Sequence, residues 1–305
     1  MSYAVTLVAS DKMTHPVTPA HANQIMGLLQ EMGAQVTSAP SWLEQNKAVD
    51  LGIANCLSIV EIERIRELLH QEKIDVFCVE LDHRRKKMIC ADMDSTIVKG
   101  ETLDDLADAV GLKERISEIT TRAMNGEIPF DSALRERVGL LKELPVSALQ
   151  STLDGIRLNA GAKSLIGVMR DHGAICVLVT GGFTFFAEPI AKACRFHQFH
   201  GNVLKIENDI LTGRVQDPIL DKTAKLDLLR EYTYKHQMKA HATLAIGDGA
   251  NDLPMLEAAG LGIGYHPKKL LREKLLNHVI HGDLTAILYA QGYSSRHMEA
   301  YYVDV

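Results

Sequence analysis

The 305-residue sequence predicts an α/β protein in three parts: a Rossmann-like core with a parallel sheet flanked by helices, a small helical cap, and an N-terminal ferredoxin-like βαββαβ unit. Two observations lead to this prediction. After residue 87, short apolar runs that end in polar or glycine-rich loops alternate with helical patterns, which is typical of buried parallel strands. Before residue 84, the order of strand and helix patterns fits a ferredoxin-like plan. We therefore expect domains at residues 1–83 and 84–305, with the cap at about 101–158.

The N-terminal unit is predicted from local patterns. Gly33 follows the first helix as a C-terminal cap, and Ser58 precedes the second as an N-terminal cap. The expected helices are 19–32 and 58–70, and the expected strands are 3–8, 35–39, 49–54 and 74–81. This order resembles an ACT domain, a module that often binds amino acids or pairs with copies of itself. Because the segment 11–19 is longer than the usual Asp-x-x-Gly turn and lacks its glycine, we expect a homodimer contact or a scaffold there rather than a ligand site.

Composition narrows the class of protein. Lys and Arg number 33 and Asp and Glu 39, for a net charge of −6, which argues against nucleic acid as the main partner. The one basic run, His83 to Lys87, is interpreted as an exposed interdomain linker. No membrane span or secretory signal is apparent. The five cysteines lack Cys-x-x-Cys spacing, and Cys78, Cys90 and Cys176 fall within apolar runs, so we expect reduced cysteines in a cytoplasmic protein.

Two carboxylates follow the apolar run Met88–Ala91. In an extended segment alternate side chains point the same way, so Asp92 and Asp94 are expected to face one spot beyond the strand. Two like charges at so short a separation are energetically costly without a cation between them, and Mg²⁺ is a cation that takes oxygen ligands. An isolated Asp-x-Asp pair is more often a solvated turn. With the loops that follow, it predicts one carboxylate as nucleophile and the other as acid and base.

A second apolar run, 175–179, ends in Thr180, Gly181 and Gly182. Glycines let backbone N–H groups turn toward an anion, and a helix expected from Phe183 would aim its positive end at the same place. Alone, this pattern favours an ordinary strand-to-helix turn.

A third run, 244–247, leads into a loop that holds Asp248, Asn251 and Asp252. Turn and cap chemistry explains one of the two carboxylates more easily than both. Upstream, Lys225 begins a helical pattern and is able to project its charge toward the loops. Because ligands bind at the carboxyl ends of strands in open α/β sheets, all three loops are expected to converge on one crevice.

The combined pattern resembles the haloacid dehalogenase superfamily, and within it the phosphoserine phosphatases. Asp-x-Asp-Ser-Thr is followed by a strand with a hydroxyl and Gly-Gly, then a lysine, then Gly-Asp-Gly-x-Asn-Asp. The resemblance runs from about Met88 to His281. One departure is Thr180, where close relatives usually have serine; threonine keeps the donor.

The resemblance implies a mechanism. Asp92 would become an aspartyl-phosphate, with Asp94 as general acid and base whose pKa the Asp92 charge would raise. Mg²⁺ would be held by Asp92, Asp248 and the main-chain carbonyl of Asp94. Phosphate contacts or support for the loop would come from Thr180, the amides of Gly181 and Gly182, Lys225, Asn251 and Asp252.

The resemblance also implies a substrate. Glu101 would bind the amino group and Arg137 the carboxylate of O-phosphoserine, while Phe130 shields the site. Spacing alone favours a surface helix charge for Arg137 and a first-turn helix residue for Glu101, and only the family pattern favours the substrate roles. The implied function is Mg²⁺-dependent hydrolysis of phosphoserine, the last step of serine synthesis. Alternatives are a phosphatase or phosphotransferase acting on another small phosphomonoester, and an amino-acid-binding regulatory protein.

Overall fold

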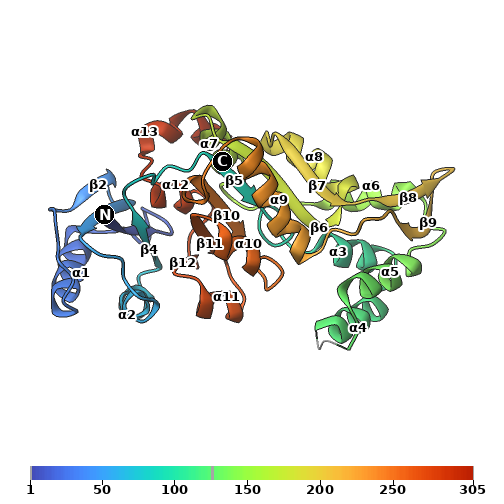
Figure 1. The fold of residues 1–305 in the computed structure, drawn as a ribbon, viewed down its shortest axis with the longest axis horizontal. Helices are drawn as coiled ribbons and strands as arrows, with labels where there is room; N and C mark the ends of the chain where they lie inside the picture. The colour runs from blue at the N-terminus through green and yellow to red at the C-terminus, as the bar shows by residue number, and fades with distance from the viewer. Residues whose placement is uncertain (1, 125–126, 305) are drawn as a thin grey trace.

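The computed structural model describes residues 2–124 and 127–304. Three parts follow one another along its long axis (Figure 1): the N-terminal unit at one end, the parallel sheet with its helices in the middle, and the cap with a β-hairpin at the other end. No helix within these described ranges is both long and apolar enough to cross a membrane.

The N-terminal unit is a four-stranded antiparallel sheet of order β2-β3-β1-β4. Its elements are β1 (Tyr3–Ala9), α1 (Pro19–Glu31), β2 (Ser41–Glu44), β3 (Ala48–Ile53), α2 (Ile59–Leu69) and β4 (Ile74–Glu80). The predicted βαββαβ order is confirmed, and Ser58 caps α2 by accepting from the Glu61 amide. The likeness to ACT domains stays a prediction.

The expected strand at 35–39 is wrong. Only a single bridge, Val36 to Ile53, forms there, and β2 begins after Pro40. Proline has no backbone N–H to donate to a ladder. The continuous pairing therefore starts at Ser41, with Trp42 packed against the apolar core of this unit.

The central sheet is six-stranded, in the order β12-β11-β10-β5-β6-β7, and the pairs between its strands are parallel. Its strands are β5 (Met88–Ala91), β6 (Ile175–Phe183), β7 (Gln198–Asn202), β10 (Thr243–Gly247), β11 (Leu261–Tyr265) and β12 (Asn277–Val279). The accompanying helices are α7 (Ala162–Asp171), α8 (Thr184–Cys194), α9 (Lys222–Lys235), α10 (Leu253–Ala258), α11 (Lys269–Lys274), α12 (Ala286–Ala290) and α13 (Ser295–Met298), with 3₁₀ turns at Ala240–Ala242 and Glu299–Asp304.

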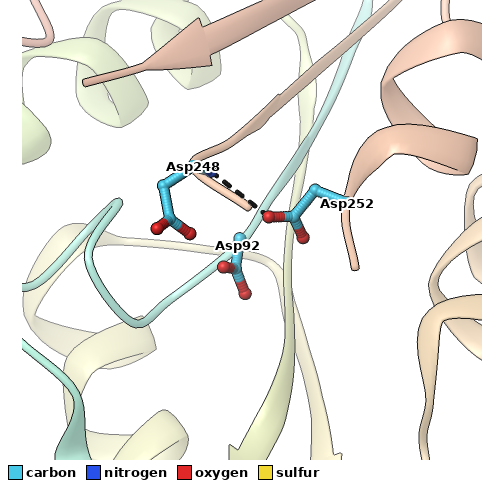
Figure 2. A group of neighbouring side chains, drawn as sticks. All are labelled: Asp92, Asp248 and Asp252. Atoms are coloured by element: carbon cyan, nitrogen blue, oxygen red, sulfur yellow. Dashed lines mark hydrogen bonds between the residues drawn. The ribbon is translucent and has the colours of Figure 1, made fainter. Parts of the chain in front are cut away.

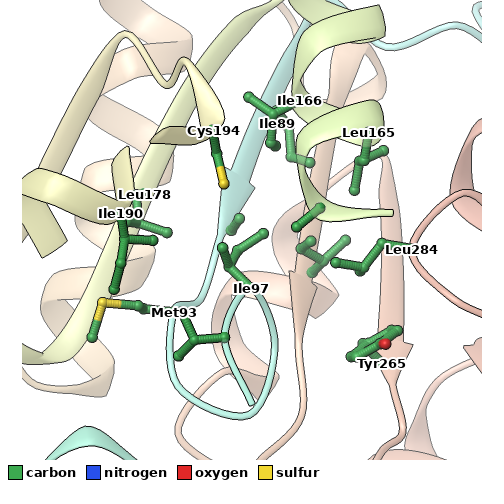
Figure 3. Packing of buried hydrophobic residues seen from close by; sticks show 14 of the residues in the cluster. Ile89, Met93, Ile97, Leu165, Ile166, Leu178, Ile190, Cys194, Tyr265 and Leu284 are labelled. Carbon is green, nitrogen blue, oxygen red and sulfur yellow. The ribbon is translucent and has the colours of Figure 1, made fainter. Parts of the chain in front are cut away.

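Both faces of this sheet are apolar, as a sheet covered on both sides requires. Ile89 and Ala91 of β5 belong to one buried cluster, and Met88 and Cys90 to another. Figure 3 shows Ile89 of the first cluster among side chains of α7 and α8. The predicted core is confirmed, and it holds the strand ends in fixed register.

The cap consists of four helices: α3 (Thr102–Ala109), α4 (Lys113–Met124), α5 (Phe130–Leu140) and α6 (Val146–Gly155). A hairpin of β8 (Leu204–Glu207) and β9 (Ile210–Val215) supports it. The Glu143 amide donates to Leu211 O and the Val146 amide to Asp209 O. These bonds tie the cap to the hairpin that leaves the central sheet.

The interpretation of residues 83–87 as an exposed linker holds only in part: His83, Arg85 and Lys87 are exposed, whereas Arg84 and Lys86 are largely covered. The Arg84 guanidinium donates to both carboxylate oxygens of Asp50 and to the carbonyls of Tyr289 and Ala290. Lys86 is only 5% exposed, and its ammonium donates to two backbone carbonyls. Long basic side chains bury their stems when their charged ends find partners. Through Arg84, this segment therefore joins β3 of the N-terminal unit to α12 of the core.

Candidate active site

The carboxyl ends of β5, β6 and β10 meet at one cavity of about 720 Å³. These are the three strands that the sequence singled out, and they are neighbours in the middle of the sheet. Most of the predicted site residues line the cavity: Asp92, Asp94, Glu101, Phe130, Arg137, Thr180, Gly181, Gly182, Asp248 and Asn251. Lys225 and Asp252 are not on this wall, and both are fully buried.

Three carboxylates cluster at this edge of the sheet, and two of them, Asp92 and Asp248, line the cavity. Asp92, Asp248 and Asp252 each offer an oxygen, and these atoms lie within 4.8 Å of one another (Figure 2). Asp252 also shapes the loop, since its Oδ2 accepts from the amides of Asp248 and Gly249, both at 3.2 Å. A Cβ atom on Gly247 would lie 2.5 Å from this carboxylate, so glycine is needed there.

Lys225 joins two of these carboxylates. Its Nζ donates to Asp92 Oδ1 and to Asp252 Oδ1, each at 2.6 Å. The lysine lies in the first turn of α9, which Asp221 caps by accepting from the amides of Thr223 and Ala224. Burial alone would lower the pKa of Lys225, but the two carboxylates outweigh it and raise that pKa. Lys225 therefore stays charged although only 1% of its surface is exposed.

Asp92 and Asp94 lie in different environments. Burial and the charge of Asp252 raise the pKa of Asp92, against the opposing effect of Lys225. Asp94 accepts from the Thr102 amide at 2.8 Å and from the Thr180 hydroxyl at 3.2 Å. Its pKa is raised by burial. The expected rise in the pKa of Asp94 is therefore confirmed, but its main cause is burial and not the expected charge of Asp92.

The expected strand that ends in Thr180, Gly181 and Gly182 is present, and the helix after it starts one residue later than expected. Strand β6 continues through Gly181 and Gly182 to Phe183, and α8 starts at Thr184. The Gly182 amide donates to Thr180 Oγ1 at 2.8 Å. A Cβ atom on Gly182 would lie 2.9 Å from Asp94 Oδ2, so glycine permits the close approach of the strand to Asp94.

The cap contributes side chains of opposite charge to the same cavity. Glu101 is the residue before α3 and accepts from Ser95 Oγ at 2.9 Å. Partial burial beside the Asp94 carboxylate raises the pKa of Glu101 to about 7. Arg137 on α5 donates to Thr120 Oγ1 at 3.4 Å. Phe130, the first residue of α5, is 40% exposed at the mouth.

Sequence reasoning missed Lys268, a basic residue of the cavity wall. Lys268 Nζ lies 2.9 Å from Asp248 Oδ2 and 3.9 Å from Glu101 Oε1. It follows the end of β11, the fourth strand to reach this edge of the sheet. The end of an apolar strand just before Lys268 could therefore have pointed to this residue. A lysine after a His-Pro pair, however, resembles an ordinary surface residue.

Comparisons with known proteins agree with this geometry. A model of the haloacid dehalogenase-like hydrolase family matches residues 89–257. A phosphoserine phosphatase of Archaeoglobus fulgidus is 41% identical over 191 residues, covering 63% of this chain and 56% of that protein. One from Streptomyces coelicolor is 32% identical over 292 residues, covering 94% of this chain and 70% of that protein. The chain therefore spans a little over half the length of the Archaeoglobus relative.

A solved structure shares the fold over nearly the whole chain. The crystal structure of a HAD family hydrolase from Salmonella enterica aligns with a TM-score of 0.80 at 25% identity. The alignment covers 95% of this chain and 98% of that one. The arrangement of N-terminal unit, core and cap is therefore one that this protein shares with a solved relative.

Proposed function

This chain belongs to the haloacid dehalogenase-like hydrolase family, and on that basis we propose that it is a phosphatase that hydrolyses O-phosphoserine to serine and phosphate. Relatives named phosphoserine phosphatase support the proposal, including one that aligns with 94% of the chain. The match of the site to this substrate is the stronger support, because it depends on this chain's own residues.

One observation carries the proposal: a single cavity is lined both by Asp92 and Asp94 and by the oppositely charged Glu101 and Arg137. Phosphoserine has a phosphate, an ammonium and a carboxylate on a short carbon skeleton. An Arg guanidinium suits a carboxylate, and a Glu carboxylate suits an ammonium. With the phosphate at the base of the cavity, both remaining charges find a partner on the cap side.

The proposed reaction has two steps. In the first, an Asp92 oxygen attacks phosphorus, the P–O bond to serine breaks, and Asp94 donates its proton to the leaving oxygen. In the second, Asp94 takes a proton from water, whose oxygen attacks phosphorus and releases Asp92. The raised pKa of Asp94 favours the protonated form that the first step needs.

The surrounding groups hold the reacting atoms in place. Lys225 is bonded to Asp92 Oδ1, which restrains that carboxylate and brings a positive charge close to the site of attack. The Thr180 hydroxyl and the Gly181 amide are proposed phosphate donors, and Asn251 lies on the same wall. Phe130 at the mouth would help to exclude water during transfer.

The donor set fits Mg²⁺. Carboxylate oxygens within 4.8 Å of one another are hard ligands at a spacing that a divalent cation bridges. Asp92, Asp248 and the Asp94 carbonyl would hold the ion, because Asp252 is already bonded to Lys225 and two loop amides. The Lys268 ammonium lies 2.9 Å from Asp248 Oδ2 and partly offsets the negative charge of this cluster. When bound, Mg²⁺ supplies positive charge that offsets the charge on the phosphoryl oxygens.

Two further proposals concern the setting of the protein. We place it in the cytoplasm, since its cysteines are free thiols. We also propose a homodimer through the N-terminal unit, at β2. The other edge, β4, is covered by β12, because the Asn277 side chain bonds both the amide and the carbonyl of Cys78. Light scattering on the purified protein tests the dimer.

A panel of phosphomonoesters tests the substrate. Phosphate release should show the highest kcat/KM for O-phosphoserine, compared with phosphoethanolamine, glycerol phosphate and glucose 6-phosphate. EDTA should abolish the release, and added Mg²⁺ should restore it. A much faster reaction with the sugar phosphate would contradict the proposed substrate. Phosphate release unaffected by EDTA would contradict the metal.

A further inference from the structure

Two cysteines in the N-terminal unit face each other far from the active site. Cys56 lies in the loop between β3 and α2, and Cys78 lies in β4. Their sulfur atoms are 3.9 Å apart, and the residues are 22 positions apart in the sequence. Neither residue has a part in the proposed phosphatase reaction.

The two thiols differ in access and reactivity. Cys56 is exposed and Cys78 is buried. A hydrogen bond from the Cys78 thiol, together with the Leu57 amide, lowers the pKa of Cys56 to about 7. The same contact and burial raise the pKa of Cys78. Because the thiolate is the nucleophile, Cys56 is the thiol that reacts first.

The backbone around the pair determines which sulfur is able to move. Cys78 pairs with Val5 in the sheet, and the Asn277 side chain holds its amide at 2.8 Å and its carbonyl at 3.2 Å. Cys56 lies outside the regular elements, two residues before the α2 cap Ser58. A disulfide needs an S–S distance of about 2.0 Å. The loop that carries Cys56 must therefore move to bring the Cys56 sulfur to Cys78, while Cys78 stays in place.

We propose that Cys56 and Cys78 are a redox-active pair that closes to a reversible disulfide when the protein meets hydrogen peroxide. The Cys56 thiolate attacks the peroxide, so that an S–O bond forms, the O–O bond breaks, and water leaves after protonation. The Cys78 sulfur then attacks the sulfenic sulfur, so that the S–S bond forms and the S–O bond breaks. The departing hydroxide takes the Cys78 proton. Two thiols lose two electrons in total, and one peroxide yields two waters.

The other three cysteines provide internal controls. Cys90, Cys176 and Cys194 are buried, and burial raises the pKa of each to about 12. A buried, protonated thiol is a poor nucleophile. Mild peroxide should therefore leave these three reduced in the folded protein.

Peroxide treatment of the full-length protein tests the proposal. After quenching and denaturation, the count of free thiols should fall from five to three, and non-reducing peptide mapping should find Cys56 joined to Cys78. Dithiothreitol should restore all five. The proposal is overturned if both thiols survive, if Cys56 oxidises to a sulfinic acid while Cys78 stays reduced, or if the linkage joins two chains.

Two substitutions separate the steps. Cys78→Ala should leave a sulfenic acid on Cys56 that dimedone labels, whereas Cys56→Ser should keep Cys78 reduced. Cys194→Ala is the matched control and should lose two thiols like the parent. Because the wild-type peptide map needs no substitution, a variant that fails to fold leaves the test intact. Phosphatase activity is not a readout, so the outcome does not depend on the proposed function.

Discussion

Lys225 donates to Asp92 across 2.6 Å, although the two residues are 133 positions apart in the sequence. The same ammonium reaches Asp252, so one buried cation serves two buried carboxylates. In a low-dielectric site, such a set is stable only while all its members are present. The contact therefore links the chemistry of the site to the stability of the fold.

Replacing Lys225 with Met should damage both stability and activity. Two buried carboxylates would lose their cation, and we expect the free energy of unfolding to fall by about 3–5 kcal/mol, measured by urea denaturation. Phosphate release should drop below detection. Lys222→Met is the control, since Lys222 is exposed on the same helix. A Lys225→Met protein as stable as the parent would show that the ammonium is not paired as described.

Arg137→Ala should weaken phosphoserine binding. Loss of a charged hydrogen bond to the carboxylate corresponds to a rise in KM of about ten- to hundredfold. Phosphoethanolamine, which has no carboxylate, should be affected far less. Arg135→Ala is the matched control, because Arg135 is exposed on the same helix and pairs with Asp217. Equal losses for both substrates would contradict the assignment of Arg137.

The pH dependence should reveal Glu101. Its pKa is raised to about 7, so the carboxylate is present above that pH and is lost as the pH falls through it. We expect kcat/KM for phosphoserine to decline below pH 7 by up to about tenfold per pH unit. The same pH profile measured with glycerol phosphate, which has no ammonium, gives the part of the decline that comes from ionisation of the phosphate. The additional decline should be missing in Glu101→Gln, and its persistence there would assign it to another group.

Arg84→Ala should loosen the contact between the N-terminal unit and the core. The Arg84–Asp50 pair is 10% and 14% exposed, and removing the guanidinium leaves a covered carboxylate without its partner. We expect the free energy of unfolding to fall by about 3 kcal/mol. Arg64→Ala on the exposed face of α2 should change it by less than about 0.5 kcal/mol. Similar values for the two variants would mean that Arg84 is no more important than a surface charge.

The central strands and their loops could be predicted from sequence because the signals there are local and strong. Apolar runs end abruptly at Asp92, Thr180 and Asp248, and parallel packing brings such ends to one edge. The family resemblance is confirmed by the match over residues 89–257. The expected convergence of these loops with Lys225 is likewise present in the structure.

The features that were missed depend on tertiary partners. The local sequence around Arg84 and Lys86 does not indicate that their side chains are bonded to Asp50 and to distant carbonyls rather than exposed. Lys268 is near the site only because β11 lies beside β10. The pKa of Asp94 is raised by burial, and the burial of this side chain depends on the tertiary structure around it.

The most direct test of the proposed mechanism is to trap the phosphorylated enzyme. The protein is mixed with ³²P-labelled phosphoserine and Mg²⁺, quenched in acid and mapped by peptide mass spectrometry. We expect an acid-stable, base-labile phosphate on Asp92, absent from Asp92→Asn whose deamidation has been excluded. A label on another residue, or rapid phosphate release by Asp92→Asn, would contradict the central role of Asp92.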